Sequence, residues 1–466
     1  MKTGTSALTT AALLLACNAL LAQTTFTVGN TSVIATPIAT NLNVPWDMML
    51  GPDGWIWFTQ ASGEVYRLNP DNGTLELIYT VPDVALHGFT AGLHSMAFHP
   101  DFANQPYIYL HYCTSNTESV VKRFYYDEAL NTFTSMSAHL LGINLTAGAS
   151  HNGSRMVLDD QGMFILTMGD HMSGSGNVQN MALAEGKFLR FDPEGGIPAD
   201  NPIPGSYVYN WGHRNPQGLT KASNGRWYSS AHGEGLDDEV NLVMPNRNYG
   251  WPSVAGLCNT ASEQAYCEAN DVVEPIHEFS DVVVAPSGID YYGHIAIPEW
   301  ENSILVCALR TRELWQLELN TGGDTVISAT PFLTGIYGRL RDVLVMPDGR
   351  VFISTSNYDW AGTEGPDDDR IIELRAETST TIVSANAETL HIAPNPASGT
   401  VRIERGTRHR EDPALMIMDA AGRMVMGKTP FRGETLDVSR VPEGCYEMIL
   451  RWPDGGQART VLVVQR

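Results

Sequence analysis

The sequence is poor in charged residues, and basic residues are the scarcer kind. Only 17% of its 466 residues are charged, with 29 lysines and arginines against 52 aspartates and glutamates, so the net charge is −23. A nucleic-acid-binding protein needs a basic face, and no basic patch is visible, so that class is excluded. Long apolar runs are also missing beyond residue 22, and we expect no membrane-spanning segment in the mature chain.

Cysteine is scarce as well, with six residues in all. Cys17 lies in the N-terminal leader. Cys113 and Cys307 lie in apolar strand-like runs, where we expect buried thiols. Cys258 and Cys267 are close together in a loop rich in Gly, Asn and Ser. In an exported chain we expect these two to form a disulfide.

The first 22 residues have the pattern of a secretory signal peptide, in which Lys2 precedes an apolar run from Ala7 to Leu21. We expect cleavage after Ala22 and export of the rest. A weak lipobox ends at Cys17, but the apolar run continues past it, which argues against lipidation.

A separate unit begins after residue 375. Residues 376–387 are rich in Thr, Ser, Ala and Glu, and we expect a linker there. Residues 388–466 carry the motifs Pro394-Asn395-Pro396 and Pro442-Glu443-Gly444-Cys445-Tyr446, which resemble the C-terminal sorting domain of the type IX secretion system. The resemblance implies a small β-sandwich, passage through the type IX secretion machinery, and a secreted or cell-surface location. A generic accessory β-domain is the alternative.

Glycine and proline, in contrast, are frequent, with 43 and 26 residues. Segments at 52–58, 160–166, 223–228 and 347–353 each join a turn rich in Pro, Asp, Asn and Gly to an alternating apolar strand. Asp-Gly and its equivalents supply the positive φ of a tight hairpin, and helical periodicity is scarce. Recurrence at intervals of roughly 40 to 60 residues predicts an all-β chain with a β-propeller, whose ligands lie at the mouth of the central channel.

The most informative stretch is Gly212-His213-Arg214-Asn215-Pro216-Gln217. With the motifs at 150–155, 168–170 and 231–241 it resembles the soluble quinoprotein glucose dehydrogenase and aldose sugar dehydrogenase family, from about Asn41 to Arg375. The resemblance implies a six-bladed propeller over residues 23–375, followed by the small β-sandwich. It also implies pyrroloquinoline quinone (PQQ) and Ca²⁺ as cofactors. The activity implied is hydride transfer from C1 of an aldose to the quinone, which gives a lactone, with electrons passing on to an unidentified acceptor.

Three residues carry the implied catalysis. His151 matches the family's catalytic histidine, and imidazole is suited to removing a hydroxyl proton at neutral pH. Asp170 matches a residue beside that histidine and would orient it. Arg214 matches the arginine near the reactive carbonyl, where its charge would stabilise the reduced cofactor. An exposed loop histidine and a surface arginine are the structural alternatives.

The implied cofactor contacts are Asn215, Arg310, Arg339, Arg341 and, more loosely, Gln179. Arg339 and Arg341 would point to one face of a strand, where two guanidinium groups repel unless an anion lies between them. The three carboxylates of PQQ suit such a pair. Arg310 replaces a family lysine, so the charge is kept but the geometry is not.

The implied metal positions lie in the motif that starts at Ala231. Gly233 and Glu234 match two positions whose backbone carbonyls bind the cofactor-associated Ca²⁺, and backbone oxygens are ordinary Ca²⁺ ligands. Glu239 matches an acidic residue that helps to hold a second, structural Ca²⁺ in some relatives. A solvated acidic loop is the alternative for Glu239.

The chain departs from the family pattern at several positions. Thr90 stands where the family has Gln or Glu, Ser150 precedes the catalytic histidine in place of an acid, and the aromatic residue expected near 284–287 is missing. The sugar is therefore open. A propeller of the same lineage that binds carbohydrate or protein without catalysis is the second hypothesis, and a Ca²⁺-dependent propeller lactonase is a third.

Overall fold

The computed structural model describes residues 23–136, 139–172, 175–377, 388–404, 412–419, 424–428, 430–452 and 457–466. Residues 1–22 and most of the expected linker, 378–387, lie outside this range, and Ala376 is the last residue of a strand. The described residues are almost entirely β-structure, as the turn-rich composition predicts. The helical elements among them are short: α1 (Ser175–Val178), α2 (Ala261–Asn270) and the 3₁₀ turn η1 (Pro298–Trp300).

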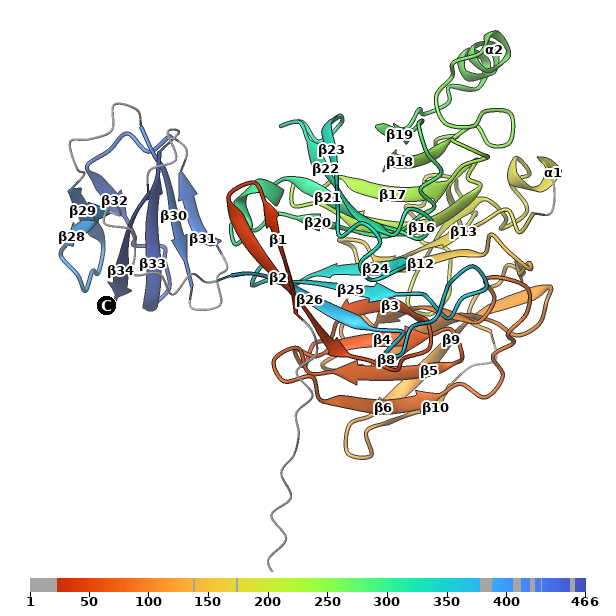
Figure 1. Cartoon of the computed structure of the whole chain (residues 1–466), viewed down its shortest axis with the longest axis horizontal. Coiled ribbons are helices and arrows are strands. Elements are labelled where there is room, and N and C mark those ends of the chain that lie inside the picture. The colour runs from red at the N-terminus through yellow and green to blue at the C-terminus, as the bar shows by residue number, and fades with distance from the viewer. Residues whose placement is uncertain are drawn as a thin grey trace, which may run out of the picture.

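Six antiparallel sheets follow one another along residues 24–376 (Figure 1). The first holds β3 (Pro45–Leu50), β4 (Ile56–Gln60), β5 (Glu64–Leu68) and β6 (Leu75–Thr80). The second holds β7 (Leu93–Phe98), β8 (Tyr107–Cys113), β9 (Glu118–Asp127) and β10 (Thr132–Ser135), with β11 (Leu145–Thr146) paired to β9. The third holds β12 (Gly153–Leu158), β13 (Phe164–Met168), β14 (Lys187–Phe191) and β15 (Val208–Trp211).

The next two sheets repeat this order of four neighbouring strands. The fourth holds β16 (Asn215–Lys221), β17 (Trp227–His232), β18 (Asp238–Val243) and β19 (His277–Phe279). The fifth holds β20 (Pro286–Tyr292), β21 (Ser303–Ala308), β22 (Glu313–Leu319) and β23 (Val326–Phe332).

The sixth sheet joins the two ends of this region. Its order is β1-β2-β26-β25-β24, with β24 (Leu340–Val345), β25 (Val351–Thr355), β26 (Ile371–Ala376), β1 (Thr24–Val28) and β2 (Thr31–Ala39). The first strand of each sheet packs against that of the next, through β3, β7, β12, β16, β20 and β24, and β24 packs against β3. The inner strands therefore form a ring of contacts, and β2 pairs with β26 to hold the chain ends together.

The turns that the sequence singled out lie at equivalent places in this repeat, between the first and second strands of a sheet. Gly54 joins β3 to β4 and has φ +79°, and Gly225 joins β16 to β17 with φ +85°. A Cβ on either glycine would meet no neighbouring atom. The glycine is therefore needed for its backbone conformation and not for space, as the hairpin argument predicts.

Arg155, on β12, is buried where three of the inner strands meet. Its guanidinium forms salt bridges with Asp47 on β3 and, at 2.9 Å, with Asp342 on β24. It also lies 5.1 Å from the ring centre of Trp46. Paired charges are tolerated at such depth because each is compensated, so this cluster ties the first, third and sixth sheets together.

The remaining strands form two further sheets, drawn in blue in Figure 1. One has the order β27-β34-β33-β30-β31 and the other β28-β29-β32. Their apolar side chains share one buried core, to which Val401 and Ile403 contribute from one sheet and Leu415 and Met448 from the other. The strands are β27 (Glu388–Thr389), β28 (His391–Ala393), β29 (Thr400–Glu404), β30 (Ala414–Met418), β31 (Met424–Lys428), β32 (Thr435–Asp437), β33 (Gly444–Arg451) and β34 (Gln457–Val464).

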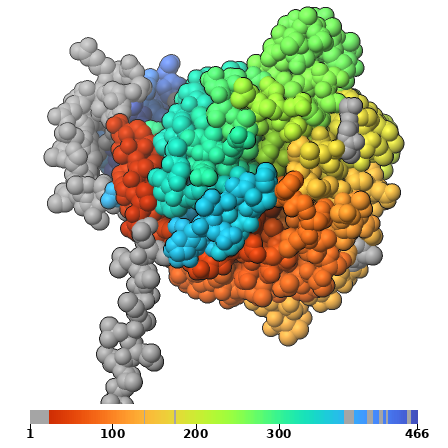
Figure 2. Space-filling model, turned by 45° about the vertical axis from the view of Figure 1, so that its right-hand side comes forward, coloured from red at the N-terminus to blue at the C-terminus, as the bar shows by residue number. Residues whose placement is uncertain are grey.

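The cysteine predictions are confirmed for the described residues. Cys258 and Cys267 form a disulfide with a Cα–Cα distance of 6.6 Å, and Cys113 and Cys307 are buried thiols. The disulfide ties α2 to the loop before it. This helix has no buried residue and stands out from the surface at the top of Figure 2.

Candidate functional site

Most of the residues expected in the site line one cavity of about 610 Å³. Its walls come from loops that begin or end strands of several sheets, as expected for a site at the mouth of a propeller. We call it the cationic cavity because five arginines line it, against two aspartates. These are Arg214, Arg310, Arg312, Arg339 and Arg341, with Asp238 and Asp359.

His151 is held in place by Asp170. The Nδ1 atom of His151 lies 2.8 Å from Asp170 Oδ1, and the side chains are 13% and 8% exposed. Burial opposes ionisation of Asp170, but hydrogen bonds from His151, Met172 N–H and Trp251 outweigh it and hold the pKa of this carboxyl below its ordinary value. Since an ionised carboxylate only accepts, it selects the tautomer with a proton on Nδ1. Nε2 of His151 is then the ring nitrogen left to accept a proton.

The backbone around His151 explains the glycine before Asp170. His151 has a left-handed backbone with φ +55°, and its carbonyl oxygen accepts a hydrogen bond from His171 N–H at 3.2 Å. A Cβ on Gly169 would lie 2.0 Å from that same carbonyl oxygen. Only glycine allows the two loops to approach this closely, so the Gly-Asp sequence brings Asp170 within reach of the imidazole.

Arg214 lies beside the pair formed by His151 and Asp170. Its carbonyl oxygen accepts from Asp170 N–H at 2.8 Å, its guanidinium is 5.4 Å from the ring centre of Trp251, and Trp251 donates to Asp170 Oδ2 at 2.9 Å. Within the part of the chain that the structure describes, the guanidinium donates one hydrogen bond, from Nη1 of Arg214 to the carbonyl oxygen of His232 at 3.4 Å. The three residues expected to carry catalysis therefore come together at one side of the cavity.

Arg339 and Arg341 share an anion supplied by the protein itself. Arg339 donates to Asp359 Oδ2 at 2.8 Å and Arg341 to the same oxygen at 3.3 Å. Burial lowers the pKa of Arg341 to about 10, and the positive charges of Arg339 and Arg155 act in the same direction. The negative charge of Asp359 opposes this effect. Both guanidinium groups reach this one carboxylate, although Arg339 precedes β24 and the pairing of β24 with β25 is irregular between Leu340 and Asp342. One carboxylate between two arginines leaves an excess of positive charge.

Asn215 and Gln217, two residues apart on β16, support this wall. Asn215 Oδ1 accepts from Gly153 N–H at 3.2 Å, which links the fourth sheet to the loop of His151. Gln217 Oε1 accepts from Arg341 Nη1 at 3.0 Å and from Ser287 Oγ at 3.2 Å. Gln217 thus orients an arginine that lines the cavity.

Gln179 does not line the cavity among the described residues. Its amide exchanges two hydrogen bonds with Asn248, both at 3.1 Å, and donates to the Trp251 carbonyl at 2.7 Å. Gln179 therefore acts on the site through the loop that carries Trp251, which in turn contacts Asp170.

The three expected metal positions differ in whether they are exposed and whether they line the cavity. Gly233 lines the cavity, whereas the side chain of Glu234 is exposed and that of Glu239 accepts from Asn241 Nδ2 at 2.9 Å. Asp238, which also lines the cavity, accepts from three backbone amides, those of Gly233, Val284 and Ala285. No group of three or more His, Cys, Asp or Glu side chains arranged to hold a metal ion is found in the part of the chain that the structure describes.

The sequence did not single out several residues that line the cavity. His232 pairs with Asn215 across β16 and β17, and burial lowers its pKa to about 3, with neighbouring cationic groups adding to the effect. The position of His232 next to Gly233, an expected metal position, was the signal in the sequence that could have placed it in the site. Asp359 and Trp360 follow β25 in a loop without a recognisable motif. Gln217 stands in the motif that begins at Gly212, but the irregular pairing of β16 between Pro216 and Gly218 breaks the alternation that would have placed its side chain.

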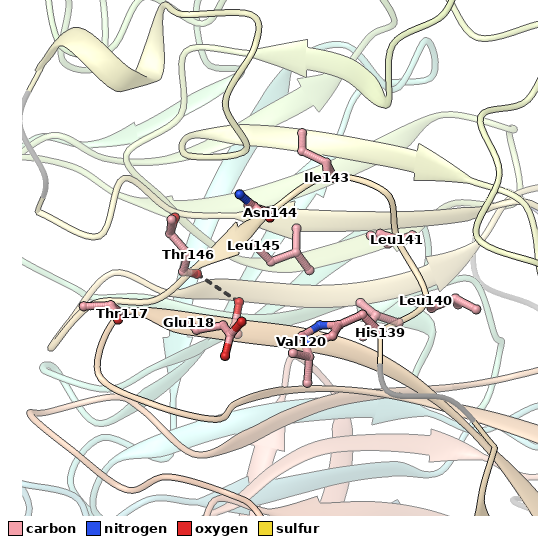
Figure 3. Close-up of a pocket in the computed structure, with 12 residues that line it drawn as sticks. Thr117, Glu118, Val120, His139, Leu140, Leu141, Ile143, Asn144, Leu145 and Thr146 are labelled. Carbon is pink, nitrogen blue, oxygen red and sulfur yellow. Dashed lines mark hydrogen bonds between the residues drawn. The ribbon is translucent and has the colours of Figure 1, made fainter.

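A second cavity, of about 320 Å³, lies against the second sheet (Figure 3). It is bounded by β9, β11 and the segment between His139 and Asn144, with apolar side chains such as Leu141, Ile143 and Leu145. It contains no arginine and shares no residue with the cationic cavity. Its lining therefore offers no arrangement comparable to that around His151.

The donors of the cationic cavity fit a small polyanion such as PQQ. Arg214 Nε and His232 Nε2 are buried and have no hydrogen-bond partner within the described residues. A carboxylate-rich ligand would satisfy such atoms and offset the excess of guanidinium groups.

Comparison with known proteins points the same way. Residues 42–361 match the family model described as glucose/sorbosone dehydrogenase, and residues 391–464 match the one described as secretion system C-terminal sorting domain. Quinoprotein glucose dehydrogenase B of Acinetobacter calcoaceticus is 29% identical over 422 residues, covering 71% of this chain and 86% of the relative. Aldose sugar dehydrogenase YliI of Escherichia coli (strain K12) is 27% identical over 330 residues, covering 67% and 87%.

A similar fold is found among solved structures. The PQQ-bound form of aldose sugar dehydrogenase from Streptomyces coelicolor superposes with a TM-score of 0.63 at 29% identity, covering 74% of this chain and 98% of the other. The putative oxidoreductase (glucose dehydrogenase) from Thermus thermophilus gives 0.63 at 29%, covering 73% and 99%.

Proposed function

Because the chain belongs to the glucose/sorbosone dehydrogenase family, we propose that it is a PQQ-dependent dehydrogenase that oxidises an aldose at C1 to its lactone. The observation that carries this proposal is the convergence of the His151–Asp170 pair with five arginines in one cavity. A base beside a polyanion-binding wall is what this oxidation requires.

The fold proposed for this activity is a six-bladed β-propeller with a separate C-terminal β-sandwich. The ring of inner strands and the pairing of β2 with β26 support six blades closed by the chain ends. The shared core of the last two sheets supports the sandwich. We place the domains at 23–376 and 388–466, joined by residues 377–387, one residue shorter than the expected linker because Ala376 ends β26.

His151 would act as the base. Its Nδ1 atom faces Asp170, so Nε2 would accept the proton of the C1 hydroxyl while Asp170 stabilises the imidazolium that forms. When bound, PQQ supplies a quinone that accepts the hydride of the same carbon. Arg214, next to this pair, would stabilise the negative charge that results.

The other arginines would hold the cofactor. Arg339 and Arg341 lie at the buried end of the cavity and Arg310 at an exposed position, so together they would bind its carboxylates at different depths. Asn215 would complete this wall, and Gln179 would support the loop of Trp251. The backbone carbonyls of Gly233 and Glu234 would hold a cofactor-associated Ca²⁺, and Glu239 would contribute to a second ion.

The chain would work outside the cytoplasm. The match of residues 391–464 to a secretion system sorting domain supports export, and we assign the partner as the type IX secretion machinery, with residues 1–22 as the signal peptide. None of the helices in the described part has the length and apolar composition needed to cross a bilayer. The natural electron acceptor would be met at the cell surface or in the medium.

Reconstitution tests the proposal. PQQ and Ca²⁺ are added to the purified full chain, cofactor binding is followed by absorbance, and dye reduction is followed with a panel of aldoses. Tight binding with turnover supports the dehydrogenase. Tight binding without turnover of any aldose contradicts the catalytic proposal and leaves a degenerate enzyme. No binding leaves the second candidate, a non-catalytic carbohydrate- or protein-binding propeller, which the departures at Thr90 and Ser150 favour.

His151→Ala separates the base from the binding site. Turnover should fall by at least about 10²-fold, the usual contribution of a positioned base, while PQQ affinity stays within a few-fold of the wild type. His99→Ala is the matched control, because this histidine lies outside the cavity and packs against Tyr107. Normal turnover in His151→Ala would show that another group is the base.

A further inference from the structure

Trp251 contacts two of the three residues to which the proposed catalysis is assigned, although it is not among the described residues that line the cationic cavity. Its indole N–H donates to Asp170 Oδ2 at 2.9 Å, and the guanidinium carbon of Arg214 lies over its ring, 5.4 Å from the centre. The edge of one ring therefore holds a carboxylate while its face holds a guanidinium group.

The position of this ring is fixed by two other segments of the chain. The backbone N–H of Trp251 donates to the carbonyl oxygen of Gly212 at 3.0 Å, and its own carbonyl oxygen accepts from Gln179 Nε2 at 2.7 Å. Gly212 has φ +87°, and a Cβ there would lie 2.4 Å from Asn248 Oδ1. Glycine at this position lets the segment of Trp251 lie against the motif that carries Arg214.

Asp170 and Arg214 have opposite charges and adjoining backbones. The N–H of Asp170 donates to the carbonyl oxygen of Arg214 at 2.8 Å, hydrogen bonds hold the pKa of Asp170 low, and arginine stays protonated. Such charges attract strongly where water is scarce. Within the described residues Arg214 nevertheless forms no salt bridge, and Asp170 is paired with His151.

A direct pair between Asp170 and Arg214 would impair both proposed roles. The carboxylate would no longer be reserved for orienting His151, and the guanidinium charge would be neutralised before a ligand arrives. An indole ring avoids both effects because it is a neutral partner for each charge. Its π face attracts a cation without cancelling the charge, and its N–H stabilises a carboxylate without adding a positive charge.

We propose that Trp251 is a positioning residue that keeps Arg214 and Asp170 from pairing with each other. In this arrangement, which rests on the proposed dehydrogenase function, the indole edge keeps Asp170 directed at His151 and the indole face keeps Arg214 charged and available to the ligand. Trp251 thereby maintains the separation between the group that accepts the proton and the group that stabilises negative charge.

Simple packing is the competing explanation, and Trp227 on β17 provides the matched control for it. Trp227 is also half-buried, and a cation lies near its ring, with Lys221 Nζ 5.8 Å from the centre. It lies outside the cationic cavity and in another sheet from Asp170. Loss of packing alone should therefore affect the two tryptophans alike, whereas loss of positioning should affect only Trp251.

The first test titrates Asp170 in the full chain without cofactor, by NMR of ¹³C-labelled aspartate, with Asp170→Asn used to assign the signal. Trp251→Phe keeps a ring over Arg214 but removes the N–H, so it should raise the pKa of Asp170. Trp251→Leu also releases Arg214 to pair with the carboxylate, so the pKa should lie below that in Trp251→Phe. Adding Arg214→Gln to Trp251→Leu should abolish this decrease, and Trp227→Phe should change nothing.

The second test measures steady-state kinetics after reconstitution with PQQ and Ca²⁺, using the aldose that the wild type oxidises fastest. Trp251→Phe should lower kcat about tenfold, the scale of a hydrogen bond to a charged group, and should move the pH–rate profile while KM stays within about twofold. Trp251→Leu should lower kcat about a hundredfold, because both contacts are lost. In an Arg214→Gln background the further loss from Trp251→Leu should be smaller, since the two changes act on one interaction.

The outcomes separate this proposal from the proposed function. If the titrations follow this order but the wild type oxidises no aldose, the role of Trp251 in keeping the charges apart stands and the dehydrogenase proposal fails. If the wild type is active, an Asp170 pKa that is the same in all variants overturns the positioning role. Losses of kcat equal to those in Trp227→Phe and Trp227→Leu, with an unchanged pH–rate profile, also overturn it. Trp251→Phe keeps the test decisive if Trp251→Leu does not fold.

Discussion

His151 Nδ1 and Asp170 Oδ1 lie 2.8 Å apart across 19 positions of sequence. The contact joins the loop before β12 to the end of β13, which are neighbouring strands of one sheet. Asp170 also accepts from Trp251, so the carboxylate holds the imidazole and is itself held. This arrangement fits the roles that we propose, with Asp170 orienting His151 as the base.

Asp170→Asn should lower kcat by roughly 10²-fold or more, because an amide oxygen cannot accept from both His151 and Trp251 and stabilise an imidazolium. PQQ affinity should change little, and the acid limb of the pH–rate profile should move. Steady-state kinetics over a range of pH test this. An unchanged profile with lower kcat would mean that Asp170 has only a structural role.

The same pair has a predictable effect on stability. Hydrogen bonds lower the pKa of Asp170 in the folded protein. At pH values above the ordinary aspartate pKa, ionised Asp170 therefore makes its full contribution to the free energy of unfolding. This contribution is lost as the pH falls through the lowered pKa of the folded state.

Arg339→Gln should weaken PQQ binding about tenfold or more and reduce its dependence on ionic strength. The residue is 9% exposed and its charge is only partly compensated by Asp359, so its attraction for a carboxylate is weakly screened. Titration at low and high salt measures both effects. Arg226→Gln, outside the cavity with a side chain 39% exposed, is the control. An affinity that is unchanged in Arg339→Gln would remove this arginine from the cofactor site.

Arg155→Met should destabilise the propeller by about 3 to 5 kcal/mol near neutral pH, because it leaves two carboxylates buried without a cation. Burial and the negative charge of Asp342 together raise the pKa of Asp47 to about 7, although the positive charge of Arg155 opposes them. An acid with a raised folded-state pKa loses stability as pH rises through that value, so the variant should recover stability when pH falls from 8 toward 5.

Chemical denaturation at several pH values measures this effect. Lys221→Met removes a surface pair with Asp160, whose side chain is 79% exposed, and should cost less than about 1 kcal/mol. Equal losses in the two variants would mean that Arg155 does not hold the three sheets together.

Removal of the disulfide with Cys258→Ser and Cys267→Ser should have a local effect. The helix α2 has no buried residue, so releasing it exposes residues 256–272 to proteases while the melting temperature and the dehydrogenase activity stay close to those of the wild type. Limited proteolysis followed by mass spectrometry locates the cuts. A large fall in melting temperature would show that the loop is part of the cooperative core.

Local sequence determined the elements of this protein. Glycine turns such as Gly54 and Gly225 start hairpins because they alone adopt positive φ without strain, and repetition of such turns predicts one sheet after another. Gly169 beside Asp170 is needed for a different reason, since a side chain there would collide with the backbone carbonyl of His151. Family resemblance added the roles of the motifs, and most of these residues lie in one cavity.

Only the tertiary structure decided which residues meet across the ring of sheets. Asp359 lies between Arg339 and Arg341, Arg155 finds carboxylates on two other sheets, and Phe89 lies beside Trp360. Nothing in the neighbouring sequence of these residues specifies their partners. Ring closure sets their positions, because it brings the first and last sheets together and aims loops from distant parts of the chain into one space.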